Sequence, residues 1–120
     1  MATVNARRET GTWLEKGPFS IRTEREPEDL YVVELYGEFD LSAAEVARPE
    51  LERVQQSDVT EIIVDLSGLE FIDSTGLSAL CQIYRKEKEG GNRVVLLRAE
   101  GLVQRVLELT GLSDTLPFAD

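Results

Sequence analysis

The sequence places three side chains suited to chemistry in a row, Asp73, Ser74 and Thr75, and Gly76 follows them. Serine becomes a nucleophile when a neighbouring base removes its proton, and histidine is the usual base. The sequence contains no histidine, which also removes the usual zinc ligand. A serine hydroxyl can instead accept a phosphoryl group, which adds about −1.5 to −2 charges at neutral pH. The residue types therefore favour a modification site over a catalytic serine.

The segments around Ser74 predict a buried strand before it and a helix after it. The continuous apolar run within Ile62 to Leu66 is typical of a central strand that is covered on both faces. After Gly76, apolar residues recur at helical spacing, and we expect the last three of them to face the sheet: Leu77, Leu80, Cys81 and Tyr84. Ser74 therefore lies at the start of a helix.

Two interpretations of Ser74 are open at this position. As an N-cap, its hydroxyl accepts hydrogen bonds from backbone N–H groups of the first helical turn. As a modification site, it gives a phosphate access to the same N–H groups and to a favourable helix dipole, although Asp73 and Asp40 would repel that phosphate. Asp40 is itself well placed to cap an earlier helix.

The remaining patterns predict a mixed α/β domain with the order β-β-α-β-α-β-α. The first two strands, near Phe19 to Ile21 and over Tyr31 to Tyr36, are expected to be antiparallel. Parallel strands with right-handed crossovers follow, which gives a four-stranded sheet with Ile62 to Leu66 and Arg93 to Leu97 central, and three main helices. Gly37 is expected to end the second strand, Pro49 to kink or restart the first helix, and Gly111 to close the third.

We assign residues 18–118 to this domain and residues 1–17 to an N-terminal extension of undetermined order, which Trp13 could attach to the domain surface. The net charge is −10, which disfavours nucleic acid and anionic membranes as partners. The sequence shows no membrane-spanning run, no secretion signal and a single cysteine, Cys81, so we expect a cytoplasmic protein. No phosphate-binding glycine motif and no metal-ligand spacing is present, so we predict no cofactor and no metal.

The chain resembles the STAS domains of anti-anti-sigma factors, also called anti-sigma factor antagonists. The resemblance covers roughly residues 18–118 and is carried by Gly37 to Asp40, Val64 to Ser67, Ile72 to Gly76 and Val106 to Leu112. It implies that Ser74 is the phosphoacceptor and that the loop at Gly37 to Asp40 lies beside it. It further implies a partner-binding surface made of Glu38, Asp40, Asp73, Ser74, Thr75 and Gly76.

The resemblance also implies the partners. The unphosphorylated antagonist binds an anti-sigma factor that is a serine kinase of the GHKL type, and this releases the sigma factor. Phosphorylation at Ser74 switches binding off, and a PP2C-type phosphatase resets the switch. The chain itself is then not an enzyme, has no catalytic residue, and acts as a monomer or weak dimer.

Two alternatives remain open. Some STAS domains are scaffolds of signalling assemblies or accessory subunits of transport complexes. More remotely, Asp-Ser-Thr-Gly suggests a homodimeric aspartic-type hydrolase, but Gly76 follows Asp73 by three residues rather than two, and a helix is predicted where that fold needs strands. The chain departs from the family pattern in its longer extension before Pro18 and in Pro49, and neither departure touches Ser74.

Overall fold

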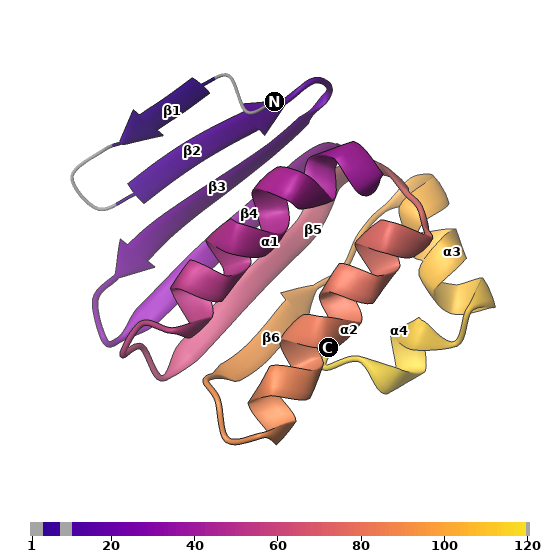
Figure 1. Ribbon diagram of the computed structural model, residues 1–120. Coiled ribbons are helices and arrows are strands. Elements are labelled where there is room, and N and C mark those ends of the chain that lie inside the picture. The colour runs from indigo at the N-terminus through magenta and orange to yellow at the C-terminus, as the bar shows by residue number, and fades with distance from the viewer. Residues whose placement is uncertain (1–3, 8–10, 120) are drawn as a thin grey trace.

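The computed structural model describes residues 4–7 and 11–119 and shows a six-stranded sheet with strands in sequence order (Figure 1). The first four strands are antiparallel neighbours, and β4, β5 and β6 are parallel. The predicted mixed sheet is therefore confirmed in its strand directions, although it has more than four strands. The strands are β1 (Val4–Arg7), β2 (Gly11–Lys16), β3 (Phe19–Glu26), β4 (Leu30–Phe39), β5 (Glu61–Ile72) and β6 (Arg93–Leu97).

The two extra strands belong to the segment that the sequence left without an element. Along β2, each residue from Gly11 to Lys16 pairs with β3, and β1 pairs with β2. Trp13 is a member of this sheet, paired with Arg22, and is 39% exposed. The division of the chain at residue 18 remains a prediction, and the parts of the extension at 1–3 and 8–10 lie outside the described residues.

Strand β6 lies at the end of the sheet, so the predicted central position of Arg93 to Leu97 was wrong. Its outer edge pairs only through a single bridge, between Leu96 and Phe118, among the residues that the structure describes. The strand was predicted to be central because its apolar run is typical of burial on both faces. In the structure Val94 and Leu96 are buried, whereas Arg93 and Leu97 are exposed.

Helices α1 (Leu41–Gln55) and α2 (Ser74–Lys88) cover one face of the sheet, and α3 (Gly101–Leu109) and α4 (Leu112–Thr115) follow β6 (Figure 1). Gly111, with φ of +80°, follows α3 as predicted. Helix α1 runs through Pro49 without the restart that was one of the two expected outcomes, and the expected kink stays a prediction. Pro49 and Glu45, whose carbonyl loses its hydrogen-bond partner, are both exposed, so water can replace that partner.

The core fills the space between the sheet and the two covering helices. Leu80 is fully buried as predicted, and Cys81 and Tyr84 are half-buried and pack against the core. Helix α2 also buries Ala79 and Ile83, so the centre of its buried face lies one residue before the predicted one. The buried face of α2 is set by which side chains fit between α1 and the sheet. Ala79 is small enough to fit there, but a small residue adds little to the apolar periodicity that is read from the sequence.

Two bulges in β5 bring the ends of β4 and β5 level. Val64 and Leu66 are buried two residues apart, but the next buried residues, Leu69 and Ile72, follow at intervals of three. Register shifts accompany these intervals, so that Phe39 at the end of β4 pairs with Ile72 at the end of β5. Gly37 was predicted to end its strand, but the strand continues to Phe39. Gly37 lies within β4 at φ of +84°, beside one of the shifts.

Candidate functional site

The strand ends bring the two segments singled out from the sequence together. The N–H of Asp73 donates to the carbonyl of Phe39 at 3.2 Å, and Phe39 pairs with Ile72. Each strand is followed at once by a helix, so the N-termini of α1 and α2 lie at the same edge of the sheet (Figure 1). Asp40 and Asp73 are therefore neighbours across this edge.

Asp73, and not Ser74, is the N-cap of α2. Its carboxylate accepts from the N–H of Thr75 at 2.9 Å and from the N–H of Gly76 at 3.1 Å. Ser74 is the first residue of the helix and is exposed. The N-cap interpretation of Ser74 was therefore wrong, since an aspartate one residue earlier does that work.

Asp40 caps α1 as predicted. Its carboxylate accepts from the N–H of Ala43 at 2.9 Å, and its backbone is extended, with φ of −114° and ψ of −170°. The cap leaves Asp40 half-exposed at the end of the bulged strand, beside exposed Glu38. Glu38 pairs with Phe71 across the two strands, so both side chains lie on the same face of the sheet.

The cap at Asp73 decides where a phosphate on Ser74 would lie. The N–H groups of Thr75 and Gly76, which the sequence suggested for the phosphate, already donate to Asp73. A phosphate on exposed Ser74 would therefore extend into solvent, with the carboxylate of Asp73 next to it in the sequence and that of Asp40 at the neighbouring helix start. The helix dipole favours such an anion, and the carboxylates oppose it. This arrangement leaves both the hydroxyl and any phosphate open to another protein.

Gly76 supports the site from inside. It is buried, and a Cβ added to it would lie 2.6 Å from the carbonyl oxygen of Phe39 and 2.7 Å from Cγ1 of Ile72. Only glycine lets the first turn of α2 approach β4 this closely. Of the predicted partner-binding residues, Glu38 and Ser74 are exposed, Asp40, Asp73 and Thr75 are half-exposed, and Gly76 is covered.

Two large apolar residues at this edge were missed from the sequence. Leu41 follows the Asp40 cap and is 69% exposed, and Phe71 near the end of β5 is 41% exposed. Leu41 precedes Ala44 by three residues and therefore matches the buried stripe of α1, and the bulges in β5 hide the orientation of Phe71. Composition and periodicity carry no signal that would have revealed either exposure.

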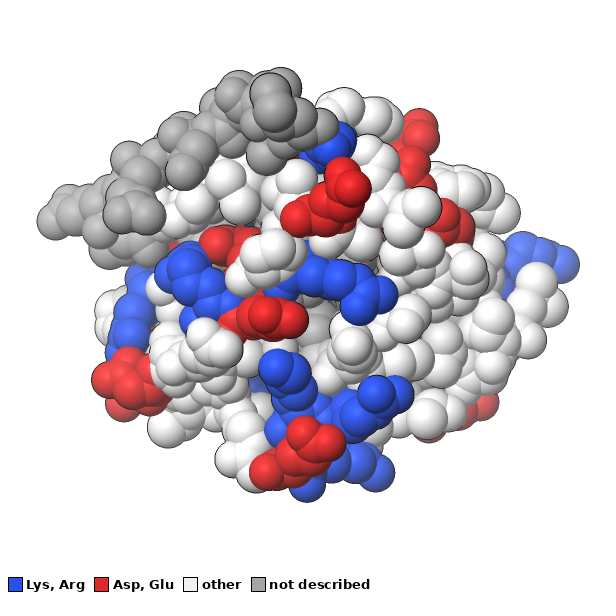
Figure 2. Space-filling model, viewed as in Figure 1, with Lys and Arg blue, Asp and Glu red and all other residues white. Residues whose placement is uncertain are grey.

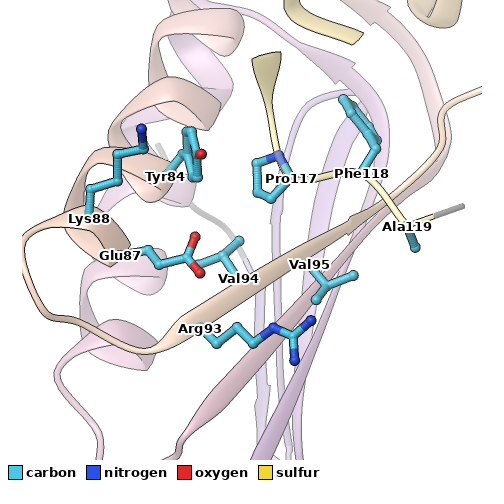
Figure 3. A pocket seen from close by; sticks show the side chains of 9 residues that line it. All are labelled: Tyr84, Glu87, Lys88, Arg93, Val94, Val95, Pro117, Phe118 and Ala119. Carbon is cyan, nitrogen blue, oxygen red and sulfur yellow. The ribbon is translucent and has the colours of Figure 1, made fainter. Parts of the chain in front are cut away.

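A surface hollow lies elsewhere on the molecule. It has a volume of about 650 Å³ and is found at the far end of α2, between that helix, β6 and the C-terminal segment (Figure 3). Tyr84 is ten residues beyond Ser74, which is roughly 15 Å along a helix. The lining is made of Tyr84, Glu87, Lys88, Arg93, Val94, Val95, Pro117, Phe118 and Ala119.

Ser74 is therefore a surface site and not the floor of this hollow. Within residues 4–7 and 11–119 there is no group of three or more acidic, cysteine or histidine side chains that could hold a metal ion. No helix in the same ranges is long and apolar enough to cross a membrane. On the face that carries the helices, acidic and basic side chains are interspersed (Figure 2).

Comparison with known proteins agrees with the resemblance seen in the sequence. An anti-sigma F factor antagonist from Lysinibacillus sphaericus is 33% identical over 82 residues, which are 68% of this chain and 70% of that protein. The structure of an anti-sigma factor antagonist from Mycobacterium paratuberculosis is 29% identical, with a TM-score of 0.73 over 83% of this chain and 84% of that one.

A further relative, the anti-sigma factor antagonist SpoIIAA from Bacillus, has been solved in two states. Its unphosphorylated form is 28% identical, with a TM-score of 0.69 over 83% of this chain and 88% of that one. Its phosphorylated form has a TM-score of 0.62 over 83% of this chain and 91% of that one. The sequence model of the STAS domain family matches residues 21–120, which include both capped helix starts. The chain therefore belongs to the STAS domain family.

Proposed function

We propose that this chain is an anti-sigma factor antagonist that is switched by phosphorylation at Ser74. In its unphosphorylated form it binds an anti-sigma factor, which is also a serine kinase of the GHKL type, and so releases the sigma factor in the cytoplasm. Relatives named anti-sigma factor antagonists support this proposal, and one of them has been solved in phosphorylated and unphosphorylated forms. The chain is the substrate of the kinase and not a catalyst.

The observation that carries the proposal is the division of labour between Asp73 and Ser74. Asp73 supplies the cap of α2, so the hydroxyl of Ser74 is exposed and has no hydrogen bond assigned to it among the described residues. A polar side chain that stabilises a fold usually makes a hydrogen bond within it. The capping hydrogen bonds of α2 are made by Asp73, so the helix does not need the hydroxyl of Ser74 for its cap. Its modification can therefore change the surface without disturbing the helix.

The proposed reaction moves one phosphoryl group from ATP to Ser74. The serine oxygen forms a bond to the γ-phosphorus, the bond between that phosphorus and the β–γ bridging oxygen breaks, and ADP leaves with that oxygen. The serine proton passes to a base of the kinase. A PP2C-type phosphatase would use water to hydrolyse the phosphoserine, which restores the hydroxyl and releases inorganic phosphate.

Charge explains how this reaction switches binding off. Immediately after transfer, the new phosphate of Ser74 faces the β-phosphate of ADP, and Asp73 lies next to it in the sequence. Like charges held together cost free energy, and a tenfold loss of affinity needs only ~1.4 kcal/mol. The phosphorylated antagonist is therefore released, whereas the neutral hydroxyl is accepted.

The test is to incubate the purified chain with ATP and each anti-sigma factor kinase encoded in its source genome. Wild type should take up one phosphate with one of these kinases, and Ser74→Ala should take up none while still binding. The matched control is Ser78→Ala, which removes another exposed serine one turn further along α2. Phosphate on Thr75 or Ser78, or unchanged uptake by Ser74→Ala, would refute the assignment.

A further inference from the structure

Helices α1 and α2 cover one face of the sheet, and the side-chain contacts identify that face (Figure 1). Lys16 of β2 reaches Glu45 of α1 at 2.9 Å, and Thr23 of β3 donates to Glu50 of α1 at 2.6 Å. Side chains alternate between the two faces of a strand, so every buried residue of β3 to β6 points to this same side. On the opposite face, which we call the open face, all residues of these four strands are half-buried or exposed.

The open face carries a band of apolar side chains that crosses the sheet from β2 to β6. Trp13 is 39% exposed, Tyr36 is 40% exposed and Leu97 is 37% exposed. The Tyr36 ring lies over Gly68 of the neighbouring strand, where it occupies the space that a Cβ would need. Beside it is a hollow of about 480 Å³, which Trp13, Ser20, Arg22 and Tyr36 line. The apolar band consists of Trp13, Val32, Tyr36, Ile63, Phe71, Val95 and Leu97.

Charged side chains of the open face pair with one another inside the chain. Arg22 lies 3.0 Å from a carboxylate oxygen of Glu24 and 3.0 Å from one of Glu34. At the other side of the sheet, Arg93 lies 3.7 Å from Glu61. A partner for this face therefore needs to bring apolar area, and it does not need a surplus of either charge.

The open face is large enough for a specific contact between proteins. Five strands, β2 to β6, lie about 4.8 Å apart, and eight paired residues rise about 3.3 Å each, so the face measures roughly 24 Å by 26 Å. That footprint is about 600 Å², and specific interfaces bury about 600–1,000 Å² on each partner. The open face thus meets the lower end of this range, which is typical of weak and reversible association.

We propose that two copies of this chain associate through their open faces, as the two sheets of a sandwich that lie about 10 Å apart. In a twofold contact each copy offers the same patch, so the apolar band of one copy meets that of the other. An identical face satisfies the requirement derived above, because it brings apolar area together with charges that are already paired. Helices α1 and α2 stay on the outside of this dimer, so the inference does not depend on the proposed function.

The test uses the full-length chain, whose only tryptophan is Trp13. Analytical ultracentrifugation from micromolar to millimolar concentration should show the mass rising from monomer to dimer. Over the same range, the emission of Trp13 should shift to shorter wavelength, because its ring leaves water. Each chain carries a net charge of −10, so sodium chloride should strengthen the dimer by screening the repulsion between the copies.

Variants locate the contact on the open face. Tyr36→Ser should raise the Kd of the dimer about tenfold, and Tyr36→Phe should keep it within about twofold of wild type. Ile63→Lys should abolish the dimer, because it buries a charge that has no partner. The matched control is Leu109→Ser, which removes a leucine that is 75% exposed on α3 and should leave Kd unchanged.

Three outcomes overturn the inference. These are a mass that stays monomeric at every concentration, a dimer that Leu109→Ser weakens as much as Tyr36→Ser does, and a dimer that salt dissociates. None of them touches the proposed function, because phosphorylation of Ser74 is measured separately. Melting temperatures equal to that of wild type establish that a loss of association is not a loss of fold. Should Tyr36→Ser and Ile63→Lys both melt early, the concentration dependence of Trp13 emission in wild type decides.

Discussion

The two strand-to-helix junctions of this domain share one backbone design and differ in what they present. Asp40 and Asp73 cap their helices with nearly the same backbone angles, φ and ψ of −114° and −170° for the first and −110° and −172° for the second. At the next position one junction carries Leu41 and the other Ser74. Because an aspartate caps each helix, the residue that follows it does not have to supply the capping hydrogen bond. Leu41 is therefore available for contact at the first junction and Ser74 for modification at the second.

The third residue after each cap shows a second difference, which concerns packing. After Asp40 the chain reaches Ala43, which is 1% exposed, whereas after Asp73 it reaches Gly76. The carbonyl of Phe39 occupies the space that a Cβ of Gly76 would need. The junction that carries Ser74 is therefore held against its neighbour by a backbone contact, which fixes the position of Ser74 relative to Leu41.

The largest expected effect comes from filling that space. Gly76→Val should lower the free energy of unfolding by about 3 kcal/mol, because the clash is with backbone and with the buried Ile72, neither of which can move freely. Urea denaturation followed by circular dichroism measures it. The reciprocal change, Ala43→Gly, should cost only about 1 kcal/mol, because it adds flexibility without a clash. Equal losses from the two changes would show that the junctions are packed alike.

A smaller effect should follow from removing the caps. Asp73 accepts from two N–H groups and Asp40 from one, so Asp73→Ala should cost about 2 kcal/mol and Asp40→Ala about 1 kcal/mol in urea denaturation. The variants Asp73→Asn and Asp40→Asn keep a capping oxygen and serve as controls. If Asp40→Ala lowered the free energy of unfolding more than Asp73→Ala does, the number of hydrogen bonds that each carboxylate accepts would not determine how much each cap stabilises its helix.

The contrast between the junctions also explains what the sequence predicted correctly. Asp40 was assigned as a cap because it stands between the apolar strand and the helical stripe, although Ser42 two residues later is also a favoured capping type. At the second junction Asp73 and Ser74 are adjacent and both are favoured at N-caps, so their types cannot decide between them. Only the start of the helix, which sequence locates to within a few residues, makes that decision.

The strands show the same limit in another form. Strand β5 was expected to end at Leu66 because its apolar run is followed there by Ser67 and Gly68, but bulges let the strand continue to Ile72. Strand β2 carries no alternation, since five of its six residues are half-buried. It is a strand because β3 offers it an edge with free backbone groups, and that partner is not visible in the residues of β2 itself.

The smallest expected effect is at Ser74, and it distinguishes a modification site from a cap. If Ser74 capped α2, Ser74→Ala would cost about 1 kcal/mol. Because Asp73 caps the helix, we expect Ser74→Ala to change the free energy of unfolding by less than about 0.5 kcal/mol, as surface substitutions generally do. Ser74→Asp should be equally mild, since its attraction to the helix dipole and its repulsion from Asp73 oppose each other. Leu41→Ala, at the equivalent position of α1, is the matched control and should be as mild. A loss of 1 kcal/mol or more in Ser74→Ala alone would mean that the hydroxyl has a structural duty. Near-zero losses in all three would mean that both junctions leave this position free for function.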